Sequence, residues 1–204
     1  MPKVRGAMVL HAVRFVRETY GPEAHERVLK RLPPEHWGTL LGPVREASWE
    51  PVADLVAYME IARALLAPGD PDFFRSLGAF SGRLERESAG FKPLVADPST
   101  SVRMAPTTWR SFYDQGHVEV KMDGPLEARA RIFGFPASEA LCERRVGAWA
   151  TLVSYAEMTA TAEELACGRN GSPFCEVRVT WTPAPARGGG DPRSAPGRGP
   201  TGRT

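Results

Sequence analysis

The sequence predicts an α+β domain, in which N-terminal helices are followed by an antiparallel sheet of two hairpins packed on a long central helix. Three observations lead to this prediction. Apolar residues recur every three or four positions over most of residues 6–87, and they alternate with polar ones between residues 118 and 135. A long apolar helical pattern then separates this first hairpin from a second pair of strand-like segments. Helices followed by antiparallel strands are typical of layered α+β folds.

The first helix is predicted over residues 6–20, because Val9, Val13, Val16 and Tyr20 recur at intervals of four, three and four. A Gly-Pro pair ends it. Similar patterns, each bounded by Pro, Gly or Ser, predict further helical segments at residues 22–32, around 36–37, from 48 onward to a turn at 68–71, at 72–87 and at 104–112.

The first hairpin is predicted from a two-residue period. Val118, Val120 and Met122 alternate with charged residues, a turn follows at 123–125, and alternation resumes over residues 126–135. On the second strand, Ala128 and Ile132 are expected to share the buried face. This period is typical of strands with one face against a core.

A long helix is predicted from Ser138, a good N-cap residue, to about residue 158. Cys142, Val146, Trp149 and Val153 share one of its faces, and it is the most apolar helix of the chain. It should therefore be the central one. The last two strands are expected at about residues 160–167 and 174–181.

Composition favours one globular domain over residues 1–182. The chain has 204 residues, 42% apolar and 25% charged. Residues 183–204 should be disordered, because 11 of these 22 residues are Gly or Pro. This tail also carries four arginines and one aspartate, so removing it turns the net charge of +2 into −1 (22 basic, 23 acidic residues). A body without basic excess disfavours nucleic-acid binding.

We expect a cytoplasmic location with no membrane span. The sequence has no run of 18 apolar residues, and its start lacks the apolar core of a secretory signal.

All three cysteines of the chain, Cys142, Cys167 and Cys175, fall in its last third, and Glu164 lies three residues before Cys167. Three thiolates and a carboxylate can form a closed tetrahedral zinc shell. Two other interpretations remain. Free cysteines are often simply buried hydrophobes, and a disulfide is disfavoured by the odd count and the missing secretory signal.

Cys142, then Glu164, Cys167 and Cys175 followed by a strand-like segment, resemble the end of the 4-vinyl reductase (V4R) domain. That domain is also the sensory part of some bacterial aromatic-responsive activators. The resemblance is most specific over residues 142–181. It implies a structural zinc held by these four residues beside a small-molecule pocket.

The resemblance also implies an overall fold, because the V4R domain is similar to haem-NO-binding domains and to subunits of the TRAPP vesicle tether. Residues 4–10 and 177–181 further resemble a paralogous family from myxobacteria.

Haem is not expected. A haem-binding variant of this fold needs an axial histidine after the helix at 72–87 and a Tyr-x-Ser-x-Arg signature. The histidines are His11, His25, His36 and His117, and no such signature occurs. The sequence also lacks a Gly-x-Gly-x-x-Gly motif, a P-loop and a Gly-x-Ser-x-Gly motif, so we expect no enzyme.

These observations predict a zinc-stabilised, small-molecule-binding sensory domain without catalytic activity. A small apolar or aromatic ligand would lie between the long helix and the hairpin sheet. Its candidate walls, which could equally be ordinary core, are Trp109, Tyr113, Phe133, Trp149 and Tyr155. No ATPase or DNA-binding segment follows, so we expect output through a protein partner. The alternative is a TRAPP-like interaction or scaffold module, for which a homodimer is expected.

Overall fold

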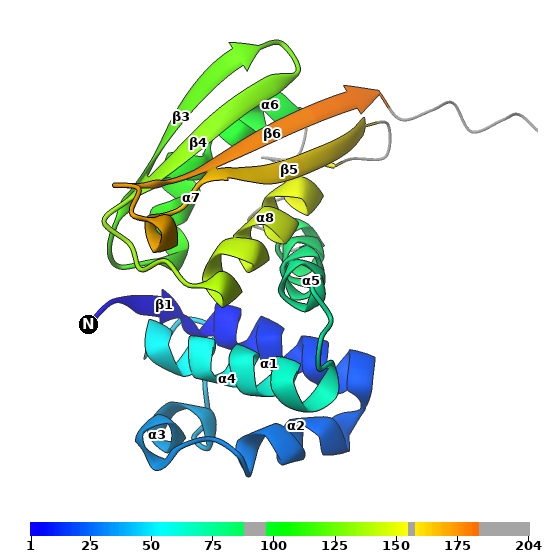
Figure 1. The fold of residues 1–204 in the computed structure, drawn as a ribbon, viewed down its shortest axis with the longest axis vertical. Helices are drawn as coiled ribbons and strands as arrows, with labels where there is room; N and C mark the ends of the chain where they lie inside the picture. The colour runs from blue at the N-terminus through cyan, green and yellow to red at the C-terminus, as the bar shows by residue number, and fades with distance from the viewer. Residues whose placement is uncertain (88–96, 155–157, 184–204) are drawn as a thin grey trace, which may run out of the picture.

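A four-stranded antiparallel sheet lies over one long helix, α8, and a group of N-terminal helices lies on the far side of that helix (Figure 1). The computed structural model describes residues 1–87, 97–154 and 158–183. The α+β class, the helices-first order and the antiparallel sheet packed on the long helix are therefore confirmed. The predicted disordered tail lies outside the described residues from residue 184 onward.

The N-terminal half is helical, as its three-to-four residue periodicity predicted. Its main helices are α1 (Gly6–Tyr20), α2 (Pro22–Leu29), α4 (Val52–Leu66) and α5 (Phe73–Glu87). A 3-10 turn (Pro34–His36) and the short α3 (Trp37–Leu40) lie between α2 and α4. Rings from α1 and α5 form their shared core, where Phe15 meets Phe73 and Phe80 edge-on at centroid distances of 5.6 Å.

A small two-stranded sheet was missed by the sequence analysis. The segment at 48–51 was expected to begin a helix, but β2 (Trp49–Pro51) instead pairs antiparallel with β1 (Lys3–Arg5) before α4 starts. The Arg5 guanidinium lies over the Trp49 ring, 4.1 Å from its centroid. Three residues are too few to show an alternating pattern, so only the distant partner strand identifies them.

The main sheet has the order β3-β4-β6-β5. Its first hairpin is β3 (His117–Gly124) and β4 (Glu127–Phe133), and its second is β5 (Met158–Ala166) and β6 (Cys175–Pro183). Alternation assigns the faces as predicted, with Ala128 and Ile132 buried. The two short helices α6 (Pro98–Arg103) and α7 (Ala105–Phe112) precede β3 and lie behind the sheet in Figure 1.

Helix α8 (Glu139–Val153) begins as predicted but ends five residues early. The Ser138 Oγ accepts the Leu141 N–H at its start. At its end, Ser154 is extended, and its hydroxyl donates to the Ala150 carbonyl and accepts the Ala160 N–H. The predicted continuation to residue 158 is wrong because Met158 already pairs with Pro183 in the sheet.

Among the described residues, none of the helices has the length and apolar character needed to cross a bilayer.

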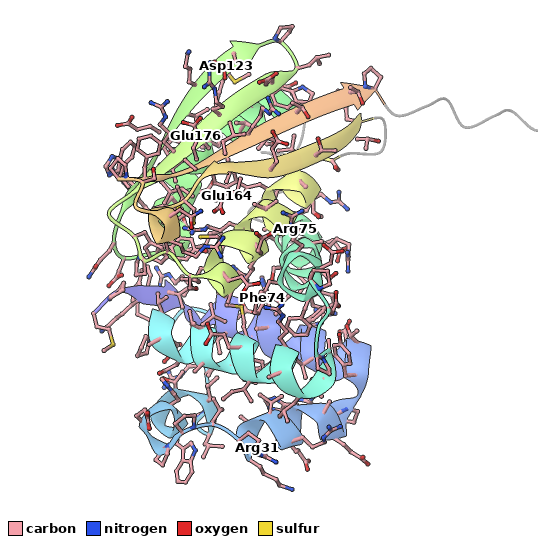
Figure 2. The ribbon with its side chains drawn as sticks, in the orientation of Figure 1. Arg31, Phe74, Arg75, Asp123, Glu164 and Glu176 are labelled. Atoms are coloured by element: carbon pink, nitrogen blue, oxygen red, sulfur yellow. The ribbon has the colours of Figure 1, made fainter. Side chains whose placement is uncertain are left out.

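Helices α5 and α8 touch backbone to backbone at two glycines. A Cβ built on Gly147 would lie 2.0 Å from the carbonyl oxygen of Arg75, and one built on Gly78 would lie 1.9 Å from that of Arg144. Figure 2 labels Arg75 at this crossing. Because the opposing atoms are backbone, they cannot rotate away. Any larger residue must push the two helices apart.

We therefore expect Gly147→Ala to destabilise the protein by about 3 kcal/mol, the upper range for overpacking a tight core. Urea denaturation followed by circular dichroism measures this change.

The control is Gly38→Ala in α3, where a Cβ meets no atom within 4 Å. It should leave stability unchanged or raise it by up to about 1 kcal/mol, since alanine favours helix more than glycine does. Equal effects of the two substitutions would contradict the close-packing explanation.

Candidate metal centre and ligand cavity

The structure brings together the four side chains that the sequence singled out. Cys142 lies in the first turns of α8, Glu164 on β5, Cys167 just after β5 and Cys175 at the start of β6. One ligand atom from each lies within 4.8 Å of the others. Figure 2 places Glu164 between the sheet and α8. Residues more than thirty positions apart thus meet at one point.

The fold explains why Glu164 rather than its neighbour joins the cysteines. Glu164 is opposite Val177 on β6 and so shares the sheet face that looks onto α8. Glu163 is opposite Arg178, forms an ion pair with it, and lies on the outer face. Alternation along a strand therefore separates two adjacent carboxylates.

The three sulfur atoms form a nearly equilateral triangle. The Sγ–Sγ distances are 3.5 Å for Cys142–Cys167, 4.0 Å for Cys142–Cys175 and 3.9 Å for Cys167–Cys175. These distances are far too long for a disulfide bond, and all three cysteines are free. Tetrahedral thiolates around a metal at about 2.3 Å are separated by about 3.8 Å. The triangle therefore has the size of one face of such a shell.

Glu164 supplies a second indication that a cation belongs here. One of its carboxylate oxygens, Oε2, accepts from Arg169 at 3.0 Å. The other, Oε1, is buried without a hydrogen-bond partner. A buried carboxylate oxygen beside three sulfurs is costly unless a cation compensates it. The residues present thus fit a metal ion.

Two arginines that the sequence analysis missed surround the cluster. Arg145 Nη2 lies 3.1 Å from the Cys142 sulfur, and Arg169 Nε lies 3.1 Å from the Cys167 sulfur. Three thiolates and a carboxylate around a divalent cation carry a net charge of −2, which two guanidinium groups offset. Arg145 lies three residues after Cys142 on α8, a spacing that brings two side chains together on a helix, and this was the available signal for it. Arg169 lies two residues after Cys167 in a 3-10 turn, where no such spacing points to it.

Hydrogen bonding within the cluster makes the cysteines unequal. The bond to Cys142, helped by the Gly168 N–H, lowers the pKa of Cys175 to about 5. The same bond, together with burial, raises the pKa of Cys142. A thiolate is thus available to a cation at neutral pH.

A cavity of about 80 Å³ lies between the middle and end of α8, the sheet and the pair α6–α7. Three of the five residues predicted to line a ligand site line it, namely Trp109, Tyr113 and Trp149. Phe133 does not, because its ring is on the outer sheet face, stacked with His117 at 5.1 Å and beside Phe174 at 5.3 Å. Tyr155 lies outside the described residues.

The cavity wall also contains polar groups that sequence reasoning missed, namely Glu85, Arg144 and Arg145. Burial raises the pKa of Glu85 to about 7, although Arg144 acts in the opposite direction. Burial, with Arg144 and Arg14 adding to it, lowers the pKa of His11 to about 4; its Nδ1 lies 3.9 Å from Glu85. Helical periodicity could not identify these groups, because it predicts which positions are buried but not which buried positions are charged.

No protein-family model matches the sequence, and no curated protein matches it. The fold, by contrast, is similar to that of solved H-NOX proteins. The H-NOX protein from S. oneidensis in the Fe(II)NO ligation state aligns with a TM-score of 0.70 at 12% identity, covering 87% of this chain and 99% of that one.

Two more H-NOX structures agree. An Fe(II) unliganded variant from K. algicida aligns with a TM-score of 0.69 at 10% identity, covering 87% of this chain and 96% of that one. An H-NOX variant from T. tengcongensis aligns with a TM-score of 0.66 at 12% identity, covering 88% of this chain and 98% of that one. These similarities confirm the predicted haem-NO-binding-like fold.

The raised pKa of Glu85 predicts a specific pH dependence. The folded protein keeps the Glu85 proton up to about pH 7, whereas the unfolded chain loses it near 4.5. Wild-type stability should therefore fall, relative to Glu85→Gln, as pH rises through this window. Each unit of pKa shift is worth about 1.36 kcal/mol, so the free energy of unfolding of the wild type should fall by about 3 kcal/mol relative to that of the variant.

Urea denaturation of both proteins at about pH 5 and about pH 8 measures this difference. His11 contributes with the opposite sign, since its lowered pKa costs stability as pH falls from 6.5, but it does so in both proteins. The exposed Glu87, changed to Gln, is the control. If wild type and Glu85→Gln differ in stability by the same amount at both pH values, the raised pKa does not belong to Glu85.

Proposed function

We propose that the protein is a zinc-stabilised small-molecule-binding sensory domain of the V4R type, without catalytic activity, whose output passes through a protein partner. One observation carries this proposal. Cys142, Glu164, Cys167 and Cys175 converge beside α8, which carries Cys142 and also forms one wall of an apolar cavity.

Zinc suits the cluster better than other common cations. Thiolate sulfur is a soft ligand that favours zinc over magnesium or calcium, and the sulfur separations match a tetrahedral ion. Three cysteines and one glutamate complete a four-ligand shell, leaving no position for water or substrate. The ion would therefore be structural, tying the β5–β6 turn to α8 and stabilising the folded state over the unfolded chain.

Haem fits this chain poorly, although the H-NOX structures that share the fold include Fe(II) forms. The cavity of about 80 Å³ is far smaller than a porphyrin, and none of the residues that line it is a histidine. His11 is the histidine near its wall residue Glu85, and its Nδ1 faces that carboxyl group. A small organic ligand is the better match.

The cavity has the composition of a small-ligand site. Trp109, Trp149 and several aliphatic side chains form most of its surface, with a few charged or hydroxyl groups among them. Mostly apolar walls with a few convergent polar groups are usual for such sites.

The outer face of the sheet supports the expectation of no nucleic acid. Its arginines are paired with carboxylates: Arg129 with Asp123, Arg131 with Glu176 and Arg178 with Glu163. This face therefore presents no unpaired basic row to a phosphate backbone.

Compared with the ligand-binding proposal, a scaffold module receives less support, because the exposed large apolar residues within the described ranges form no extended patch: Met1, Trp37, Leu41, Leu126 and Leu165.

The zinc proposal predicts about one zinc per purified chain, measured by elemental analysis. Cys167→Ser and Cys175→Ser should each lose the zinc and much of the thermal stability, because each removes a ligand from a closed shell. Glu164→Gln should weaken zinc binding at least ~10-fold in a competition assay with a chromophoric chelator.

Glu163→Gln is the matched control, since this neighbouring carboxylate is on the opposite sheet face. It should keep wild-type zinc affinity. A metal-free wild-type protein, with unaltered stability in both cysteine variants, would refute the zinc proposal and favour the scaffold alternative.

The ligand proposal is tested by filling the cavity. Thr108 lines it from α7, whereas Thr107 on the same helix is exposed. We expect phenol, a small aromatic probe, to bind the wild-type protein in calorimetry and to quench tryptophan fluorescence, because Trp109 and Trp149 are in the wall. Thr108→Phe should abolish both signals by occupying the space.

Thr107→Phe adds the same ring outside the cavity and should leave both signals intact. Loss of phenol binding in both variants, or in neither, would place the binding elsewhere and contradict this cavity as the ligand site.

A further inference from the structure

Two consecutive arginines lie inside the molecule, in the wall of the cavity. Arg144 is 2% exposed and Arg145 is 4% exposed, and both are on α8. Arginine is almost never fully buried unless it is paired. The hydrogen bonds that each guanidinium group makes therefore show which kind of partner is missing from the cavity.

Arg144 is only weakly compensated. Its Nη2 lies 3.1 Å from the Ser81 hydroxyl and 3.0 Å from the Met8 sulfur, and a thioether is a weak acceptor. Its Nε is buried without a hydrogen-bond partner. The guanidinium thus retains an unsatisfied donor and much of its charge.

Arg145 contacts the metal cluster and also lines the cavity. Its Nε donates to the Leu141 carbonyl at 3.1 Å, and its Nη2 approaches the Cys142 sulfur of the metal cluster. Its Nη1 is buried without a partner. Adjacent residues of one helix, both of which line the cavity, thus each have one buried donor without a hydrogen-bond partner.

The charge balance indicates what the missing partner is. Among the lining residues, Glu85 is one carboxylate beside two guanidinium groups, of which Arg145 also offsets part of the charge of the metal cluster. Burial raises the pKa of Glu85 to about 7, so this carboxyl group is only partly ionised at neutral pH. A carboxylate matches the planar fork of a guanidinium and accepts its N–H groups in charge-assisted bonds.

We infer that the ligand of this cavity is a small apolar monocarboxylate, with its carboxylate held by Arg144 and Arg145 and its hydrocarbon body against Trp109, Trp149 and Val153. This inference rests on the proposed ligand-binding function and names the chemical class of the ligand. Its hydrocarbon body is small, because the cavity volume is only about 80 Å³. A short or branched chain fits better than a fused ring.

The test compares isovalerate with isovaleramide, which has the same shape but no charge, by calorimetry on the full zinc-loaded chain. We expect the carboxylate to bind at least ~10-fold more tightly than the amide, in line with a charge-assisted bond. Arg144→Met should remove this preference while leaving the weak amide binding unchanged.

Arg83→Met is the control, since Arg83 is exposed on α5 and lies over the Phe80 ring. It should keep the wild-type preference. The ligand comparison on wild-type protein does not depend on whether Arg144→Met folds. Arg144→Lys provides a second variant that keeps the charge but loses the fork, and it should weaken the carboxylate selectively.

The outcomes separate this inference from the function on which it rests. Phenol binding without isovalerate binding, equal affinity for acid and amide, or a preference that survives Arg144→Met would each overturn the carboxylate assignment while the cavity remains a ligand site. Failure of phenol, acid and amide to bind would overturn both.

Discussion

The close contact between α8 and α5 is the constraint on which the rest of the molecule depends. Gly147 and Gly78 allow two helix backbones to meet without side chains between them. With one side of α8 held against α5, its opposite side is free to support the sheet through Val146 and Trp149. A helix covered on both sides must bury its polar residues as well. This is why Arg144 and Arg145 are inside the protein and not at its surface.

The same helix connects the two sites. Cys142 belongs to the cysteine cluster, Arg145 contacts that cluster and lines the cavity, and Arg144 lines the cavity without contacting the cluster. An ion in the cluster would fix the β5–β6 turn against α8 and hold the Cys142 sulfur beside Arg145. Because Arg145 has a limited set of donors, whatever occupies one site changes what that residue offers to the other. The two sites are thus parts of one polar network inside an apolar core.

Local periodicity predicted the longer helices and strands that bury one face, such as α1 and the β3–β4 hairpin. It failed where the deciding partner is remote: β2 depends on β1, and the end of α8 depends on Met158 pairing with Pro183. Among the site residues, the cysteines were recognisable by type. Glu85 was not, because its burial comes from tertiary packing. Phe133 was misplaced because aromatic character does not specify a sheet face.

Similarity to H-NOX structures at 10–12% identity defines how the elements are arranged but not what they bind. An arrangement of helices around a sheet leaves a cavity beside α8 whatever lines it, and the lining then selects the ligand. Here the cavity is small and its lining mostly apolar, with two arginines, one glutamate and no histidine among its residues. The volume of about 80 Å³ is also far smaller than a porphyrin. Two buried guanidinium groups in a mostly apolar wall favour an anionic over a neutral ligand, and this is the basis of the proposed carboxylate.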